Sequence, residues 1–445
     1  MKKLIKTIII AFSVSVSYAG DYILMDDETE TYISEIVEKI RKAMGYERKI
    51  KVYISSDQTI NACAIPSGDI IVNAGAIINC SNYKELIAIL AHEVGHIEGR
   101  HIQLYISHIK DFVKAGLVPT LIGVAITAVS GNPMALMAGV MGGQSISQGM
   151  ALSKMRQKEE IADTKAAETL KKLGWYIFDG CVAMHKKLES KSFIYNEYIS
   201  THPLSSKRIR KYKEYEKKYK ETQISDNTLK LFERYKKKFE ILKKKLQALV
   251  ISSEFLHTLF NNTKTSDEQY AKAIVLYRRK RYTEAIKLID KIQNKDIDQL
   301  AYYAEIKCMS LINLGKNEEA TEIARTLLGK ITNINAHGDL VIIYAESVSS
   351  GKLKKDIYQA ITYLKHLLAT RNEDISFLHM LGKLYSITNQ HEEASYCMAK
   401  VAYLQGDLRL SKYHANKATH CTNTVTRRKL QDLLISIQNE EHARK

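Results

Sequence analysis

The residues His92, Glu93 and His96 form the pattern His-Glu-x-x-His, and their spacing predicts a catalytic metal site. Residues four apart on a helix lie on one face with Cβ atoms about 5–6 Å apart, so the two imidazoles can bind one Zn²⁺. Glu93 lies about 100° further round the helix, where its carboxylate borders the same ion and can take a proton from a zinc-bound water. One helical turn is therefore expected to supply two metal ligands and a general base.

The alternative is that these residues recur by chance in a helix that has other reasons to exist. An apolar, helix-forming run at residues 85–91 precedes them, so the helix is expected to be buried. Burying ionisable side chains without partners is costly. The metal site is therefore the favoured interpretation.

A third ligand is expected from a downstream helix over residues 156–167. The metzincin pattern would place a third histidine at position 102, which is Ile102 in this chain. A glutamate would instead complete the open His₂Glu set of catalytic zinc. Glu159 and Asp163 stand four residues apart and share a helical face. We therefore expect Glu159 to bind the metal and Asp163 to accept a hydrogen bond from a ligand histidine.

Residues 60–75 read as two short strands joined by a turn at residues 66–68. Because proline is disfavoured inside a sheet, Pro66 indicates that at least one of these strands ends at an edge. An edge strand can pair with an extended peptide through main-chain groups, which gives affinity with little sequence preference. An ordinary hairpin packed under the metal helix is equally consistent with the pattern.

Residues 1–19 are expected to be a cleavable secretory signal peptide. Three lysines precede an apolar run from Thr7 to Val16, and Ser17 and Ala19 supply small residues at the positions that determine cleavage. The apolar run is too short to span a bilayer, which argues against an uncleaved anchor. Export also makes nucleic acid a poor candidate partner.

A second apolar stretch, residues 113–149, is rich in small residues and is interrupted by glycine and proline. Its first apolar block is shorter than the roughly 20 residues that span a membrane. A helical hairpin is expected here. It is either part of the core or an exposed flap that touches the membrane or covers the active-site cleft.

The chain has 445 residues and a formal net charge of +17, and the positive excess is concentrated in one stretch. Between Lys207 and Lys245 there are 16 basic and six acidic residues. This stretch predicts a basic helical connector, which is either simply solvated or lies against an anionic membrane surface or an acidic partner.

The chain from residue 267 to its end is expected to be helical and repetitive. Alanines at the start of each second helix recur at Ala285, Ala320, Ala360 and Ala394, at intervals of 35, 40 and 34 residues. A period near 34 with small residues at helix crossings is typical of tetratricopeptide repeats, which stack into a solenoid with a concave groove. The groove can bind partner proteins or pack against the rest of the chain.

Four motifs, in this order, resemble those of the gluzincin peptidase family that includes HtpX and the CAAX prenyl proteases. They are Asn61-Ala62-x-Ala64-x-Pro66-x-Gly68, Leu90-Ala91-His92-Glu93-x-x-His96, Glu159-x-x-Ala162-Asp163 and Ser200-Thr201-His202-Pro203. The resemblance implies a zinc ion bound by His92, His96 and Glu159, with Glu93 as the base. Glu160 adjoins Glu159, but only Glu159 stands four residues before the aspartate, as the family pattern requires.

The resemblance also implies roles for residues outside the metal helix. The strand with Asn61, Ala62 and Ala64 is the implied substrate edge. His202 is implied to lie over the zinc and restrain the enzyme, whereas general zinc-peptidase chemistry would have it stabilise the oxyanion of the intermediate. Arg208, shortly after it, is a weaker candidate for supporting the same site.

These patterns predict an α+β, mostly helical chain of four parts. They are a signal peptide at residues 1–19, a gluzincin-type zinc metallopeptidase domain at 20–205, a basic helical connector at 206–266 and an α-solenoid of tetratricopeptide repeats at 267–445. The expected activity is that of a zinc-dependent endopeptidase in which Glu93 activates a zinc-bound water.

The resemblance implies a periplasmic protein that degrades misfolded or stalled outer-membrane β-barrel proteins and contacts the machinery that inserts them. Peripheral contact with a membrane is a further expectation. The alternative function is that of a chaperone or assembly factor, which acts through the repeats while the peptidase site stays latent and gated.

Overall fold

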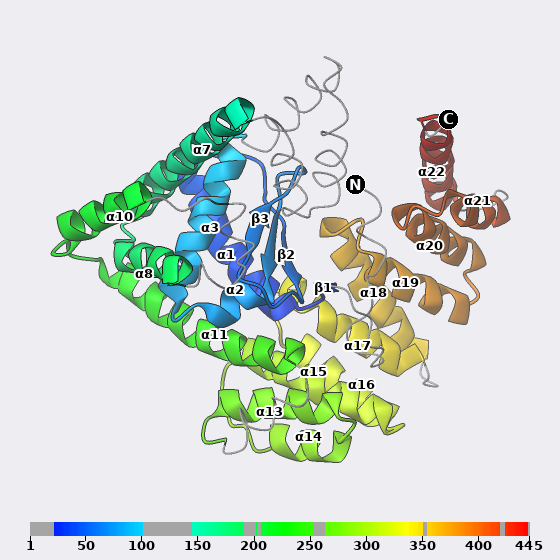
Figure 1. The fold of residues 1–445 in the computed structure, drawn as a ribbon. Helices are drawn as coiled ribbons and strands as arrows, with labels where there is room; N and C mark the ends of the chain where they lie inside the picture. The colour runs from blue at the N-terminus through cyan, green and yellow to red at the C-terminus, as the bar shows by residue number, and fades with distance from the viewer. Residues whose placement is uncertain are drawn as a thin grey trace. The chain divides into compact units, whose positions relative to one another are not determined.

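The computed structural model describes residues 22–100, 145–190, 202, 206–251, 263–349, 354–418 and 423–443 (Figure 1). These residues fall into two compact units, one within residues 22–251 and the other within residues 263–443. The predicted signal peptide and most of the apolar stretch at 113–149 lie outside the described residues. A mostly helical chain with one small sheet agrees with the predicted α+β class.

The first unit contains a four-stranded sheet in the order β1-β2-β4-β3. β2 and β4 pair in parallel, and β3 pairs antiparallel with β4, so β3 lies at an edge of the described sheet. Gly68 permits the tight turn between β3 and β4, because its φ of +75° lies in the left-handed region that favours glycine. The strands are β1 (Ile23–Leu24), β2 (Val52–Ser55), β3 (Ala62–Ala64) and β4 (Ile70–Asn73).

The helices of the first unit surround α3 (Tyr83–Glu98), which carries the predicted metal ligands. The others are α1 (Asp27–Met44), α2 (Ala74–Asn79), α7 (Ser145–Lys172), α8 (Phe178–Ser190), α10 (Ser206–Tyr219) and α11 (Asp226–Val250). Asn82 caps α3, since its side chain accepts hydrogen bonds from the main-chain N–H groups of Lys84 and Glu85. α3 contacts α1, α7, α8 and β3, and every residue from 85 to 97 is buried. The ligand histidines therefore lie in the interior.

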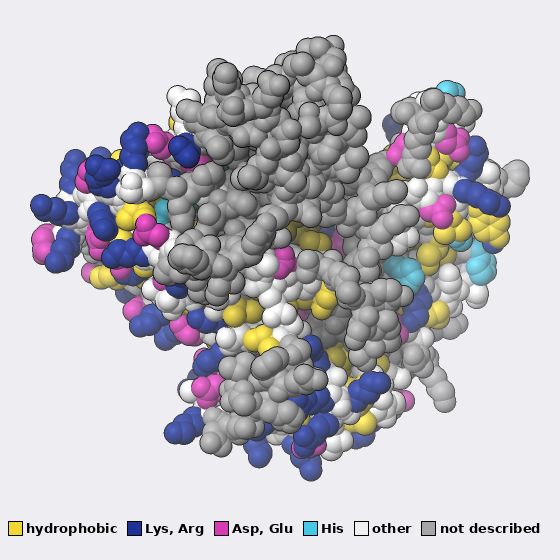
Figure 2. Space-filling view, in the orientation of Figure 1, with side chains coloured by type: hydrophobic (Ala, Val, Ile, Leu, Met, Phe, Trp, Pro, Cys, Tyr) yellow, Lys and Arg dark blue, Asp and Glu magenta, His cyan; other side chains and the backbone are white. Residues whose placement is uncertain are grey.

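The helices of the predicted basic connector, α10 and α11, pack within the first unit. On α11, Phe232 and Tyr235 contact the single tryptophan, Trp175, with ring centroids 5.8 and 6.1 Å away. Except for the buried Arg208, the basic side chains of α10 lie on its outer side, and Figure 2 shows lysines and arginines gathered over this helix. Both helices are thus amphipathic. Trp175 is 2% exposed, so its fluorescence can report on the folding of this unit alone.

The second unit is a run of helices in which neighbours in sequence pack against each other. The four alanines that set the predicted repeat period, Ala285, Ala320, Ala360 and Ala394, are all buried, as close helix crossings require. The tetratricopeptide identity itself stays a prediction. The helices are α13 (Ser266–Arg278), α14 (Tyr282–Ile289), α15 (Ile297–Asn313), α16 (Asn317–Leu328), the 3₁₀ helix η1 (Ile334–Ala336), α17 (Gly338–Ser349), α18 (Lys354–Thr370), α19 (Ile375–Ile387), α20 (His391–Leu404), α21 (Leu408–Lys417) and α22 (Thr424–Ala443).

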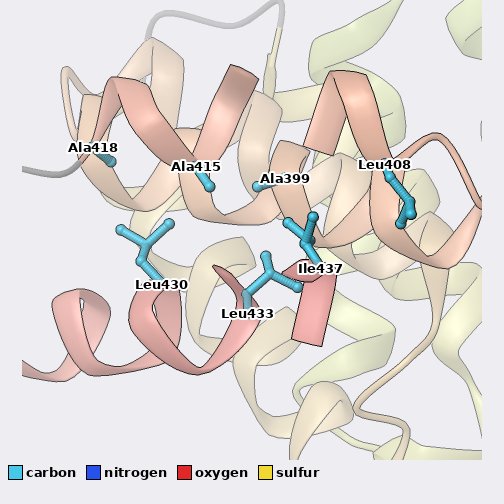
Figure 3. Packing of buried hydrophobic residues seen from close by; sticks show 7 residues of the cluster. All are labelled: Ala399, Leu408, Ala415, Ala418, Leu430, Leu433 and Ile437. Carbon is cyan, nitrogen blue, oxygen red and sulfur yellow. The ribbon is translucent and has the colours of Figure 1, made fainter. Parts of the chain in front are cut away.

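The C-terminal end of this run is closed by an apolar cluster between α20, α21 and α22 (Figure 3). Its members are Ala399, Leu408, Ala415, Ala418, Leu430, Leu433 and Ile437. None of the helices in the part of the chain that the structure describes is long and apolar enough to cross a membrane.

A buried ion cluster joins the start of α1 to α11. Lys245 Nζ lies 2.6 Å from Asp26 Oδ1 and 2.8 Å from Glu28 Oε2. Lys238 Nζ lies 2.6 Å from the other oxygen of Glu28. Burial by itself raises the pKa of Glu28, but the two ammonium groups outweigh it and lower the pKa to about 2.

We expect Glu28 to make the first unit sensitive to acid. Because its pKa is lowered in the folded state, its contribution to stability is fully present above the unfolded value of 4.5 and is lost as the pH falls towards 2. Between pH 6 and pH 3, wild type should lose about 2 kcal/mol more unfolding free energy than Glu28→Gln. Urea unfolding followed by Trp175 fluorescence measures this difference. The exposed control Glu47→Gln should follow wild type, and equal losses in wild type and Glu28→Gln would contradict the prediction.

Candidate metal centre

The candidate ligands come together because α3 and α7 cross at very short range. Gly95 on α3 faces Ala162 on α7, and a Cβ at Gly95 would lie 2.9 Å from the carbonyl oxygen of Ala162. A larger residue at this position would push the two helices apart. Ala162 lies between Glu159 and Asp163 in sequence, so the contact brings both acidic side chains of α7 to the histidines of α3.

Four buried side chains direct ligand atoms to a common point. His92 Nε2 lies 3.0 Å from His96 Nε2 and 3.2 Å from Glu159 Oε2, and His96 Nε2 lies 3.2 Å from Glu159 Oε1. His202 adds its Nδ1, which is 3.2 Å from His92 Nε2 and 3.1 Å from Glu159 Oε2. One ligand atom from each of the four residues lies within 4.8 Å of all the others.

The spacing and the charges of this cluster fit a divalent metal ion. A tetrahedral zinc with bonds of about 2.0–2.1 Å separates its ligand atoms by about 3.3 Å, close to the separations found here. The buried carboxyls of Glu93, Glu159 and Asp163 carry three negative formal charges when ionised, and the buried Arg208 supplies one positive charge. A divalent cation therefore brings this group of buried charges to neutrality.

Glu93 lies beside the cluster rather than in it. Its Oε2 accepts a hydrogen bond of 3.1 Å from the main-chain N–H of Ala64 on β3. Its Oε1 is buried without a hydrogen-bond partner among the described residues, and His202 Nε2 lies 3.5 Å away. A buried acceptor in this state is uncommon and fits a place for water next to the metal ligands. Burial raises the pKa of Glu93, which makes its carboxylate a stronger base.

An outer layer of polar groups holds the ligands in place. His92 Nδ1 lies 2.9 Å from Asp163 Oδ1, so the carboxylate can fix the tautomer that leaves Nε2 as a metal ligand. Arg208 on α10 donates from Nε and Nη2 to the two oxygens of Asp163, at 2.5 and 3.0 Å. Its Nη1 lies 3.0 Å from Glu159 Oε2. The Tyr212 hydroxyl also donates to Asp163, at 3.2 Å. α10 thus supplies the hydrogen-bond donors that hold the acidic side chains of the candidate site.

The pKa shifts in the cluster indicate that a bound cation would replace a proton. Burial disfavours a charged His92, but hydrogen bonds to Asp163 and Glu159 outweigh burial and raise its pKa to about 10. Burial and the neighbouring His92 lower the pKa of His96 to about 3. Burial would raise the pKa of Glu159, but the nearby histidines, His202 first, hold it well below its usual value. A metal ion bound here would take the place of the proton on His92.

The structure brings most of the predicted site residues into one place. Ala62 is buried in the sheet, and the buried Asn61 has a side-chain oxygen without a hydrogen-bond partner among the described residues. Glu160 points away from the cluster, since its carboxylate pairs with Lys207 Nζ at 2.8 Å. The residues brought together are Ala64, His92, Glu93, His96, Glu159, Asp163 and His202.

The sequence patterns do not identify Tyr212 as part of the site, and they indicate Arg208 only weakly. Tyr212 stands four residues after Arg208, so the two share a face of α10, and this spacing was the available signal. It could not reveal what that face contacts, because the partner carboxylates come from α7.

Comparison with known families matches residues 27–216 to Peptidase family M48. The chain is 23% identical over 277 residues to the beta-barrel assembly-enhancing protease of Yersinia pestis, an overlap of 61% of this chain and 55% of that protein. It is 27% identical over 212 residues to the mitochondrial metalloendopeptidase OMA1 of Schizosaccharomyces pombe, an overlap of 46% of this chain and 58% of that protein. The chain thus spans little more than half the length of these relatives. The resemblance predicted from the sequence motifs is confirmed.

The cluster predicts that a divalent cation stabilises the first unit. A ligand that binds only the folded state adds about 2.7 kcal/mol of stability at 100 times its Kd. We expect chelator-treated protein to unfold at a lower urea concentration, followed by Trp175 fluorescence, and one equivalent of Zn²⁺ to restore the midpoint. His92→Ala should abolish this response, whereas His379→Ala, at an exposed position of α19, should keep it. A midpoint that chelator and zinc leave unchanged would count against the metal centre.

Proposed function

We propose that this chain is a zinc-dependent endopeptidase, which the match of residues 27–216 to Peptidase family M48 supports. The observation that carries the proposal is the buried ligand cluster, which is bordered by a carboxylate oxygen of Glu93 that has no hydrogen-bond partner among the described residues. His92, His96 and Glu159 would hold the zinc, as the His₂Glu set of a catalytic site.

The chemistry follows from the placement of Glu93. Zinc bound at this site supplies a Lewis acid that polarises the scissile carbonyl and lowers the pKa of a bound water. Glu93 Oε1 takes the proton from the attacking water and passes it to the leaving amine. The N–H of Ala64 holds the other oxygen of this carboxylate, so Oε1 keeps its direction. Asp163 keeps the His92 ring in the orientation that a ligand needs.

We further propose that peptide substrates pair with β3. Support comes from the position of β3 at an edge of the sheet and from the hydrogen bond between its Ala64 N–H and Glu93. A peptide strand added beside β3 would run past the base. Because such pairing uses main-chain groups, it gives affinity with little sequence preference, which suits cleavage of unfolded segments.

His202 supports a gated form of this activity. Catalytic zinc keeps three protein ligands and an open position, whereas a fourth protein ligand closes the site. The Nδ1 atom of His202, 3.2 Å from His92 Nε2 and 3.1 Å from Glu159 Oε2, stands where such a fourth ligand would. We propose that His202 restrains the resting enzyme and withdraws when substrate binds. The same position of His202 supports the second candidate function, that of a chaperone with a latent peptidase site.

The proposed setting is the periplasm, with misfolded or stalled outer-membrane β-barrel proteins as substrates. This part rests on the predicted signal peptide and on the similarity to a protein named beta-barrel assembly-enhancing protease. The second unit would act as a set of tetratricopeptide repeats that holds substrates or the insertion machinery, which its sequential helix packing and buried alanines support. The basic outer face of α10 would supply the peripheral membrane contact.

Glu93→Gln should retain zinc and lose peptide cleavage. The amide keeps the shape of the side chain but cannot accept the proton, so kcat should fall by about 10²–10⁴-fold. Zinc content per chain and cleavage of an unfolded outer-membrane β-barrel protein test this, with Glu47→Gln as the control. A native protein that neither holds nor takes up zinc would overturn the enzyme proposal. Assembly activity that survives in Glu93→Gln would favour the chaperone.

His202→Ala should raise cleavage several-fold at unchanged zinc content, because it removes the side chain that fills the open position. The measurement is kcat and KM for the same unfolded substrate, with His379→Ala as the matched histidine control. If kcat falls instead while KM stays the same, His202 stabilises the transition state and does not restrain the site.

A further inference from the structure

We propose that Arg208 is a positioning residue, which clamps the two acidic side chains of α7 in the arrangement that the metal needs. The inference rests on the proposed function, since it concerns the same metal centre. Arg208 contacts Glu159 directly and reaches His92 through Asp163. It therefore acts on two of the three proposed protein ligands.

The guanidinium group spans one turn of α7. Its Nε and Nη2 donate to the two oxygens of Asp163, while its Nη1 lies 3.0 Å from Glu159 Oε2. Side chains four apart on a helix have Cβ atoms about 5–6 Å apart, which a planar fork of donors can bridge. The single ammonium group of a lysine cannot make the same set of contacts in one plane.

Arg208 is itself held firmly. Its side chain is 2% exposed, and the neighbouring Ile209 and Tyr212 are buried. α10 packs against α7 and α8, and the Tyr212 hydroxyl donates to the same oxygen of Asp163 that faces His92. The clamp is therefore part of the packed interior and not a mobile surface side chain.

Two effects of Arg208 on metal binding oppose each other. Its positive charge repels a cation and weakens binding. The planar set of N–H donors on its guanidinium group keeps Glu159 and Asp163 in place and strengthens metal binding. Arg208→Lys separates the two effects, because it keeps the charge and loses the fork. A weaker zinc affinity in this variant can then be assigned to positioning.

The test compares native protein with Arg208→Lys and Arg210→Lys, using competition with a chelating dye to measure zinc affinity. Loss of a residue that orients metal ligands costs about 10–100-fold in metal affinity, so Arg208→Lys should bind zinc that much more weakly. Arg210, exposed on the same helix, is the matched control and should leave the affinity unchanged. The visible absorption of the Co²⁺-loaded protein should change only in Arg208→Lys, because these bands report the geometry of the ligands. A general loss of stability would not shift these absorption bands.

An Arg208→Lys protein with the zinc affinity and cobalt spectrum of the native protein would overturn the inference and leave the proposed function standing. A native protein that binds no zinc would overturn both. If Arg208→Lys lacks the folded fluorescence of Trp175, Arg208→Gln takes its place, because it removes the charge that repels a cation together with the contacts to both carboxylates. A weaker zinc affinity is expected there too and can be assigned only to positioning, whereas a native or tighter affinity would overturn the inference.

Discussion

The contact between Gly95 on α3 and Ala162 on α7 sets the distance across which a metal ion can be bound. Each helix by itself carries half of the candidate site, with imidazoles on α3 and carboxylates on α7. A Cβ at Gly95 would lie 2.9 Å from the carbonyl oxygen of Ala162, so the crossing leaves no room for a larger residue. The separations of 3.0–3.2 Å among the ligand atoms of His92, His96 and Glu159 depend on this packing.

Burial of the cluster imposes a second constraint, which is charge. Three carboxyls and one guanidinium lie in the interior, and burying ionised groups is costly unless their charges are paired. A cation bound by the cluster and the guanidinium of Arg208 would together meet this need. The same arrangement explains why Glu93 stands apart from the ligands. Its carboxylate is held by a main-chain N–H and keeps one oxygen for proton transfer.

α10 and α11 show how a strongly basic stretch can belong to a packed domain. The lysine excess predicts a solvated connector, yet the inner face of these helices is made of apolar and aromatic residues such as Ile209, Tyr212, Phe232 and Tyr235. A helix packs by its apolar stripe, so its net charge does not decide whether it joins a core. Through this packing α10 delivers Arg208 and Tyr212 to the site, and α11 covers Trp175.

Local spacing alone placed His92 with His96, and Glu159 with Asp163, because residues four apart share a helical face in any helix. The sequence by itself therefore determined which candidate ligands share a helical face and the mostly helical class, and its patterns predicted Glu93 as the base. Only the tertiary structure decided that these two pairs face each other, that Glu160 turns to Lys207, that β3 lies at the sheet edge and that Arg208 bridges two carboxylates. Distances within a helix follow from its own geometry. Distances between two elements depend on the size of the side chains where the elements cross. The spacing of residues along the chain does not show which elements will cross.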